Sequence, residues 1–212
     1  MNAPLLHPDL RDPPNTLRLT RAANGILMSP DEFEAITDYD ERFRYELING
    51  VVIVNPAVSI GETDPNEELG HLLRSYAEND PKGSALDCTA YEREVRIGDN
   101  IRRCDRAIWT GLGRLPDIKI DIPSIVIEFV SRGKRSFLRD YVDKRSEYLS
   151  AGVREYWVIN RFARAMHVFF PSSSPVAERV VEESQTYSTP LLPGFVLPLA
   201  RLIAKGVRWD KH

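Results

Sequence analysis

Residues 125–131 read IVIEFVS, and the basic loop RGKR follows at 132–135 before a helical pattern begins. From 125 to 130 every residue except Glu128 is apolar. An apolar run without alternation predicts a strand that is covered on both faces, near the centre of a sheet. An ionised carboxylate in such a strand is costly unless a metal ion or a basic side chain holds it.

The segment after this loop has the spacing of a helix that packs on the strand. Lys144 and Arg145 fall within its apolar stripe, and positions 137, 141, 144 and 148 stack along one side. We therefore expect Lys144 to point inward, where its ammonium group can meet the Glu128 carboxylate. The apolar stripe consists of Phe137, Leu138, Tyr141, Val142, Tyr148 and Leu149.

Length, charge and cysteine content limit the class of protein. With 212 residues and a net charge of −3, the chain fits one domain better than a uniformly basic nucleic-acid coat. No run is apolar for the length of a membrane span, and the two cysteines, Cys88 and Cys104, fit a reducing compartment. We expect a cytoplasmic protein without a membrane partner, with a flexible arm over residues 1–28 and a single domain over residues 29–212.

Turn and capping signals divide the chain into alternating helices and strands. We expect a helix over 29–37, a hairpin over 45–54 that turns at Asn49-Gly50, a loop over 57–63, and a helix over 64–79. Strands are expected over 84–97, 101–110, 155–160 and 166–170, in addition to the central strand. This order predicts an α/β (α+β) domain with a mixed sheet.

Four charged residues stand in or beside apolar segments: Glu46, Asp105, Glu128 and Lys144. An aspartate on one strand and a glutamate on its neighbour can share a Mg²⁺ ion, which prefers a few carboxylates together with water and substrate phosphate. A nearby lysine can stabilise charge on a phosphate or orient the attacking water. This is the minimum set for metal-assisted hydrolysis of a phosphodiester.

Each of these residues also has a simpler interpretation. Asp105 can form a surface salt bridge with a neighbouring arginine, and Glu128 can form a buried ion pair. Glu46 can form a cross-strand pair, and Lys144 can extend over apolar surface toward solvent. A literal Pro-Asp pair also precedes Glu128 at Pro116-Asp117, but it lies in a glycine-containing loop without a strand pattern, so Asp105 is preferred.

The order of these residues resembles the Uma-two family, which is grouped with the endonucleases. Its members show patterns like R-x-P-D, E-V-x-S, D-x-x-x-K-x-x-x-Y and G-V-x-E-Y-W, and the resemblance covers roughly residues 29 to 170. The corresponding segments here are Tyr45-Glu46-Leu47-Ile48-Asn49-Gly50, Arg103-Cys104-Asp105, Ile127-Glu128-Phe129-Val130-Ser131, Asp140 with Lys144 and Tyr148, and Gly152-Val153 with Glu155-Tyr156-Trp157-Val158-Ile159.

The resemblance implies a restriction-endonuclease-like fold of the PD-(D/E)xK type, with a mixed central sheet flanked by helices. It implies catalytic roles for Glu46, Asp105, Glu128 and Lys144, with metal held by Asp105 and Glu128 and with Glu46 as an accessory acid. The superfamily often carries a lysine two residues after the glutamate, where this chain has Val130. The family pattern moves that lysine to the helix, onto Lys144.

The chain departs from the family pattern at three places. Cys104 stands where proline is usual before the aspartate, Arg132 follows Ser131 where proline is common, and residues 59–62 read SIGE where many members carry a histidine. These departures leave the four main positions intact.

Three functions fit these observations. The first is a DNA endonuclease that depends on Mg²⁺ (or Mn²⁺) and acts as a monomer or a homodimer. The second is a non-catalytic nucleic-acid-binding domain on a nuclease scaffold, and the third is a hydrolase of another phosphoester. For nucleic acid, the expected contacts are Arg103, Arg132, Lys134 and Arg135.

Overall fold

The computed structural model describes residues 17–133, 138–174 and 177–210. Its helices are η1 (Arg21–Ala23), α1 (Pro30–Glu34), α2 (Ile60–Asn79), η2 (Gly83–Ala85), the π-helical turn η3 (Arg139–Asp143), α4 (Lys144–Ser150) and α5 (Leu199–Val207). Its strands are β1 (Phe43–Ile48), β2 (Val51–Pro56), β3 (Leu86–Ile97), β4 (Asn100–Thr110), β5 (Ile125–Phe129), β6 (Glu155–Asn160), β7 (Ala165–Phe169), β8 (Glu178–Glu182), β9 (Thr186–Tyr187) and β10 (Leu197–Pro198).

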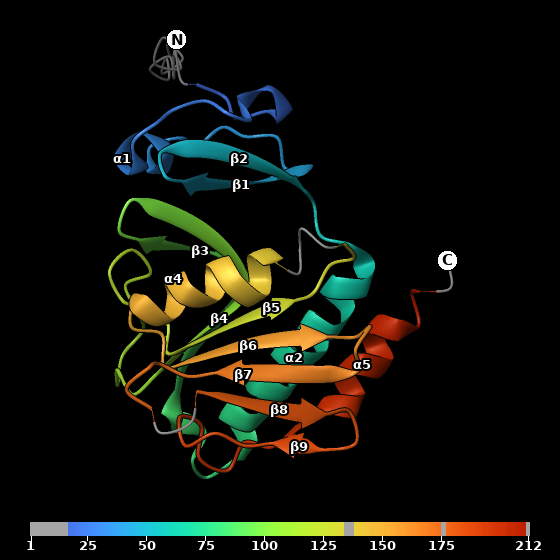
Figure 1. The fold of residues 1–212 in the computed structure, drawn as a ribbon. Coiled ribbons are helices and arrows are strands. Elements are labelled where there is room, and N and C mark those ends of the chain that lie inside the picture. The colour runs from blue at the N-terminus through green and yellow to red at the C-terminus, as the bar shows by residue number, and fades with distance from the viewer. Residues whose placement is uncertain (1–16, 134–137, 175–176, 211–212) are drawn as a thin grey trace, which may run out of the picture.

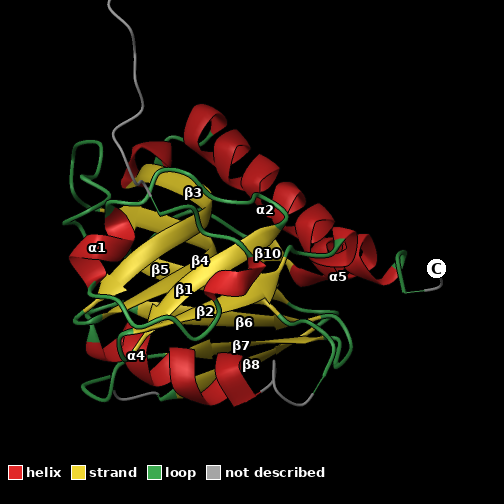
Figure 2. Cartoon of the chain, turned by 90° about the horizontal axis from the view of Figure 1, so that it is seen from above, coloured by secondary structure: helices red, strands yellow, loops and turns green. Residues whose placement is uncertain are grey.

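One eight-stranded mixed sheet runs through the molecule in the order β2-β1-β4-β5-β6-β7-β8, and β3 pairs with β4 outside this path. Strands β5 and β6 are parallel and the other neighbours are antiparallel. Figures 1 and 2 show α4 on one face of the sheet and α2 with α5 on the other. The predicted fold class, a mixed sheet with flanking helices, is confirmed. Because one sheet joins these elements, we propose that residues 29–212 form a single domain.

Strand β5 is the central strand that its sequence predicts. All five of its residues are buried, between β4 on one side and β6 on the other. Ile125, Ile127 and Phe129 pack into the core under α2 and α5, whereas Val126 packs with Tyr148 of α4. Glu128 has the same parity as Val126, so its carboxylate lies on the α4 face.

Helix α2 begins earlier than the sequence pattern indicated. The prediction of a loop over 57–63 is wrong for residues 60–63, because Ser59 caps a helix that starts at Ile60. Glu62 accepts a hydrogen bond from the backbone N–H of Ser59 (3.0 Å), which makes this the capping glutamate. Pro65 lies inside the second turn, where it removes one backbone hydrogen bond near the helix end.

Two further expectations need correction. Residues 17–28 were assigned to a flexible arm, but they pack on the hairpin: Leu19 and Ala23 are buried with Val52, and the Gly25 N–H donates to the Val52 carbonyl (2.8 Å). The first sixteen residues lie outside the described ranges. In the expected stripe, Leu138 and Val142 are exposed; residues 139–143 form a π-helical turn, so the α-helical spacing assumed for the stripe does not hold there. Phe137 also lies outside the described ranges.

No helix within the described ranges is both long and apolar enough to cross a membrane.

The two candidate helix starts can be separated by mutation. Replacing Glu62 with alanine should destabilise the protein by about 1 kcal/mol, because the N-cap of α2 then loses its partner. A helix that began after Asp64, as the sequence predicts, would have Glu67 as its capping glutamate. Glu67 is instead exposed within α2, and Glu67→Ala should stay within about 0.5 kcal/mol of wild type. Urea unfolding of both variants measures this, and a larger loss from Glu67→Ala would contradict the observed start.

Candidate active site

Strands β1 and β5 share one edge of β4 and diverge along it. Strand β3 pairs with β4 from residue 100 to residue 110 except at Asp105, whereas β1 meets the opposite edge at residue 101 and β5 meets it at residues 106–108. Residues 102–105 therefore face no strand on this edge. We call this stretch the fork. In Figure 1 the β1–β2 hairpin lies on one side of it and β5 lies on the other.

Side chains replace the missing strand pairing in the fork. The backbone N–H of Arg103 donates to Glu46 Oε1 (3.0 Å), and the carbonyl of Arg103 accepts from Lys144 Nζ (2.7 Å). Lys144 Nζ also lies 2.9 Å from Glu128 Oε1 and 3.4 Å from Glu46 Oε1. The predicted inward direction of Lys144 is confirmed, and its ammonium group joins β1, β4 and β5.

Asp105 lies opposite Glu128 on the same face of the sheet. Each residue is one step beyond the Arg106–Ile127 pair of the β4–β5 ladder, so their side chains point the same way. Asp105 Oδ2 accepts from the backbone N–H of Phe129 (2.7 Å), and Oδ1 pairs with Arg44 Nη2 (3.0 Å). The structure thus brings together the four residues expected at the site, while their catalytic roles stay predictions.

Four further charged residues surround this group, and the sequence analysis did not assign them to the site, although Asp140 is part of the family motif. Arg44 lies two residues before Glu46 and binds both Asp105 and Glu92. Glu92 stands beside Asp105 across the β3–β4 ladder, in a left-handed backbone conformation with φ of 52°. Arg139 binds the fully buried Asp140 (2.9 Å).

Some signals for these residues exist in the sequence. Asp140 opens the D-x-x-x-K segment, and Arg44 has the same strand parity as Glu46. Glu92 could be found only from the strand register.

Burial and neighbouring charge set the protonation of the site. Burial raises the pKa of Glu128 well above its usual range, and the carboxylates of Asp105 and Asp140 add to this effect against the opposing charge of Lys144. Burial alone would lower the pKa of Lys144, but the surrounding carboxylates outweigh it and raise that pKa. Burial alone would raise the pKa of Glu46, but Lys144 and the Arg103 N–H outweigh it and lower that pKa. Lys144 is therefore a charged hydrogen-bond donor at neutral pH.

The charge cluster has one negative charge in excess when all of its groups are ionised, because five carboxylates face four cations. This excess is consistent with binding of a further cation. The members are Glu46, Glu92, Asp105, Glu128 and Asp140 as acids and Arg44, Arg103, Arg139 and Lys144 as bases.

The residues of the fork fit a divalent cation by their chemistry. Asp105 and Glu128 present hard oxygen ligands from adjacent strands, as Mg²⁺ prefers. The buried hydroxyl of Tyr148 has no hydrogen-bond partner among the described residues, and its pKa is raised by burial and by nearby groups that include Glu128. Such a hydroxyl suits a site that takes up water or a hydrated ion. The described residues contain no ready-made cluster of three or more metal ligands. Basic side chains instead hold the carboxylates of Asp105 and Glu128.

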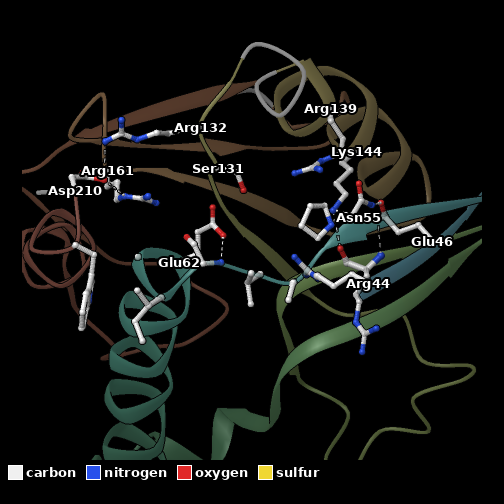
Figure 3. A pocket seen from close by; sticks show the side chains of 18 residues that line it. Arg44, Glu46, Asn55, Glu62, Ser131, Arg132, Arg139, Lys144, Arg161 and Asp210 are labelled. Atoms are coloured by element: carbon white, nitrogen blue, oxygen red, sulfur yellow. Dashed lines mark hydrogen bonds and ion pairs between the residues drawn. The ribbon is translucent and has the colours of Figure 1, made fainter. Parts of the chain in front are cut away.

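A cleft of about 940 Å³ opens above the charge cluster. Figure 3 shows Lys144, Glu46 and Arg44 at one end of it and Arg132, Arg161 and Asp210 at the other. Six bases and three acids line it: Arg44, Arg103, Arg132, Arg139, Lys144 and Arg161 against Glu46, Glu62 and Asp210. This electropositive lining suits a polyanion, although the whole chain carries a net charge of −3.

The expected nucleic-acid contacts have different outcomes. Arg103 and Arg132 both line the cleft. Lys134 and Arg135 lie outside the described residues. Asp117 of the alternative Pro-Asp pair is exposed in the loop after β4, where its side chain accepts from the backbone N–H of Lys119 (3.0 Å).

A mixed sheet with a central acid pair, an inward lysine and an arginine-lined cleft is the arrangement expected of the restriction-endonuclease-like fold. Comparison with known families places the chain more closely. Residues 30–200 match the model of the Uma2 family, described as "Putative restriction endonuclease", and the chain belongs to this family, the Uma-two family that the motifs indicated.

Among solved structures, the chain is similar to one described as a "putative nuclease belonging to DUF820" from Anabaena variabilis ATCC 29413. The TM-score is 0.66 at 17% sequence identity, over 84% of this chain and 98% of that one. At this identity the likeness supports the fold alone. No curated protein matches the chain.

Neutralising Glu128 tests whether its negative charge lowers the stability of the metal-free fold. The Glu128 pKa is higher in the folded protein than the unfolded value of about 4.3, so above that pH the folded state binds more protons. The stability of wild type in EDTA should therefore fall as pH rises through the folded pKa. Glu128→Gln lacks this loss and should melt above wild type near neutral pH, by a margin that shrinks toward about pH 5.

Thermal melts over this pH range measure the difference, with the exposed Glu182→Gln as control. Lys144 keeps Glu46 and the Arg103 carbonyl as partners in the variant. A loss of roughly 3–5 kcal/mol in Glu128→Gln would instead show that the carboxylate is a required structural partner.

Proposed function

We propose that this protein is a metal-dependent endonuclease that hydrolyses phosphodiester bonds of DNA. The observation that carries the proposal is the placement of Asp105 and Glu128 on one face of two adjacent strands, with Lys144 at the same point. The arginine-lined cleft above them supplies the polyanion-binding surface that such a substrate needs. Family membership supports the same class of reaction.

The residues of the site divide the chemistry in the following way. Asp105 and Glu128 would hold a divalent cation, and such a cation would supply activation of water and neutralisation of charge on the scissile phosphate. Lys144 is charged, so it donates a hydrogen bond to the phosphate or to the attacking water and does not serve as a general base. Arg103 and Arg139 lie at the cleft wall, where their guanidinium groups can bind flanking phosphates. Glu46 keeps Lys144 charged and in place.

A non-catalytic nucleic-acid-binding domain is the second candidate. The observation that favours it is the pairing of each acid with a base of the same chain, Asp105 with Arg44 and Glu128 with Lys144. In that function the charge cluster would serve the fold, and the cleft would bind the nucleic-acid backbone. For either function we propose a cytoplasmic protein, which its two free cysteines support.

A plasmid assay separates the two functions. Purified protein should cut supercoiled DNA in Mg²⁺ or Mn²⁺ and not in EDTA. Asp105→Asn and Glu128→Gln should lower the rate by at least about a hundredfold, because both remove charge at the reacting centre. Asp117→Asn is the matched control and should cut normally, since this residue is exposed in a loop. DNA binding without cleavage under all metal conditions would leave the binding domain as the function.

The cleft can be tested apart from catalysis by the salt dependence of binding. Arg132 is exposed at the cleft, where it bonds to Asp210 (3.3 Å). Arg132→Ala should reduce the slope of log affinity against log salt concentration by about 1, as expected for one lost phosphate contact. Arg114→Ala, which removes an exposed arginine outside the cleft lining, should leave the slope unchanged. Fluorescence anisotropy with labelled DNA in EDTA measures both, and equal slopes for all three proteins would exclude this contact.

A further inference from the structure

One oxygen of Asp105 is occupied by a base of the same chain. Asp105 Oδ2 is held by the Phe129 N–H, so Oδ1 is the oxygen with which Asp105 could bind a cation from the cleft. Arg44 Nη2 lies 3.0 Å from this Oδ1. Arg44 lines the cleft, whereas the buried Asp105 does not, so a cation from the cleft would meet Arg44 before it reaches this carboxylate.

Arg44 has a second acidic partner beside the first. Its Nε lies 3.0 Å from Glu92 Oε2, and Arg103 Nε lies 3.2 Å from the same oxygen. Both Nε atoms are buried and neither makes a hydrogen bond in this arrangement. A small rotation of Arg44 away from Asp105 could complete a hydrogen bond to Glu92, which would offset the lost contact.

The backbone conformation of Glu92 indicates that the surrounding structure holds this second partner in place. Glu92 has φ of 52° in the middle of β3, and its neighbours Tyr91 and Arg93 pair normally with β4. A left-handed conformation is strained for a residue with a side chain and occurs mainly where the surroundings require it. Here the conformation accompanies a Glu92 carboxylate that binds Arg44 and Arg103 at once.

We propose that Arg44 is a cation placeholder: it neutralises Asp105 in the metal-free protein and moves onto Glu92 alone when a divalent cation binds Asp105 and Glu128. This inference rests on the proposed metal site. Arg44 then sets the metal affinity of the site, because the arginine and the metal compete for the same carboxylate oxygen. Once released, its guanidinium group remains beside the cleft and can bind a phosphate of the substrate.

Arg44 and Glu92 should affect the metal affinity of the site in opposite directions. Removing the competitor should tighten metal binding, and removing the alternative partner should weaken it, because Arg44 is then left with Asp105. Coupling between two such equilibria is typically on the order of tenfold. If Glu92 were a metal ligand instead, its removal would weaken binding whether or not Arg44 is present.

Isothermal titration with Mn²⁺, using the full chain, tests these signatures. Arg44→Met should bind Mn²⁺ on the order of tenfold more tightly than wild type, and Glu92→Gln several-fold more weakly. In the Arg44→Met background, Glu92→Gln should have no further effect. Arg42→Met is the matched control and should bind as wild type does, since Arg42 is exposed on the same segment and its ion pair among the described residues is with Asp40, away from the site.

Thermal melts supply a readout independent of titration heats. In EDTA, Arg44→Met should melt below wild type, because Asp105 is left without its base, and Mn²⁺ should raise its melting temperature more than that of wild type. Equal or weaker Mn²⁺ binding by Arg44→Met, or a loss from Glu92→Gln that persists in the double variant, would overturn the placeholder while leaving the metal site intact. Absence of Mn²⁺ binding by every protein would overturn both. Should Arg44→Met fail to fold, an unchanged Mn²⁺ affinity in Glu92→Gln would still overturn the placeholder.

Discussion

The ammonium group of Lys144, buried in the fork of β4, is the contact on which the site depends. Taken out of water, an isolated ammonium group is too costly to keep, and it is stable here because Glu128, Glu46 and the Arg103 carbonyl accept from it or neutralise it. Both carboxylates in turn have Lys144 as a charged partner. The position of α4 on the sheet is therefore fixed by charge as well as by the packing of Tyr148.

The fork explains why these groups can meet at all. A continuous sheet would pair the Arg103 backbone with a neighbouring strand and would leave no space for Glu46 and Lys144 beside it. Because β1 and β5 diverge, that backbone is satisfied by two side chains, and the opening continues into the arginine-lined cleft. The loss of strand pairing and the formation of the site are two consequences of one feature of the sheet.

Local patterns in the sequence predict some of this arrangement, and the rest depends on contacts between distant residues. Glu128 in an apolar run and Lys144 in a helical stripe are local signals, and both side chains meet as expected. The start of α2 differs from the prediction because two capping patterns, ending at Glu62 and Glu67, stand five residues apart. Glu92 carries no local signal and Arg44 only its strand parity with Glu46, since their contacts arise from the pairing of β1, β3 and β4.

The electrostatics of the fork favour a functional origin over a structural one. A core that needed only stability would be served as well or better by apolar side chains of similar volume, because desolvating several charges costs more than most pairs return. Here Asp105 and Glu128 repel one another across adjacent strands, and burial raises the pKa of Glu128 further. A fold retains such a cluster at a cost in stability, and the proposed cation would offset that cost by binding between the two carboxylates. In the proposed function the bases that hold the acids, Arg44 above all, would stabilise the metal-free protein.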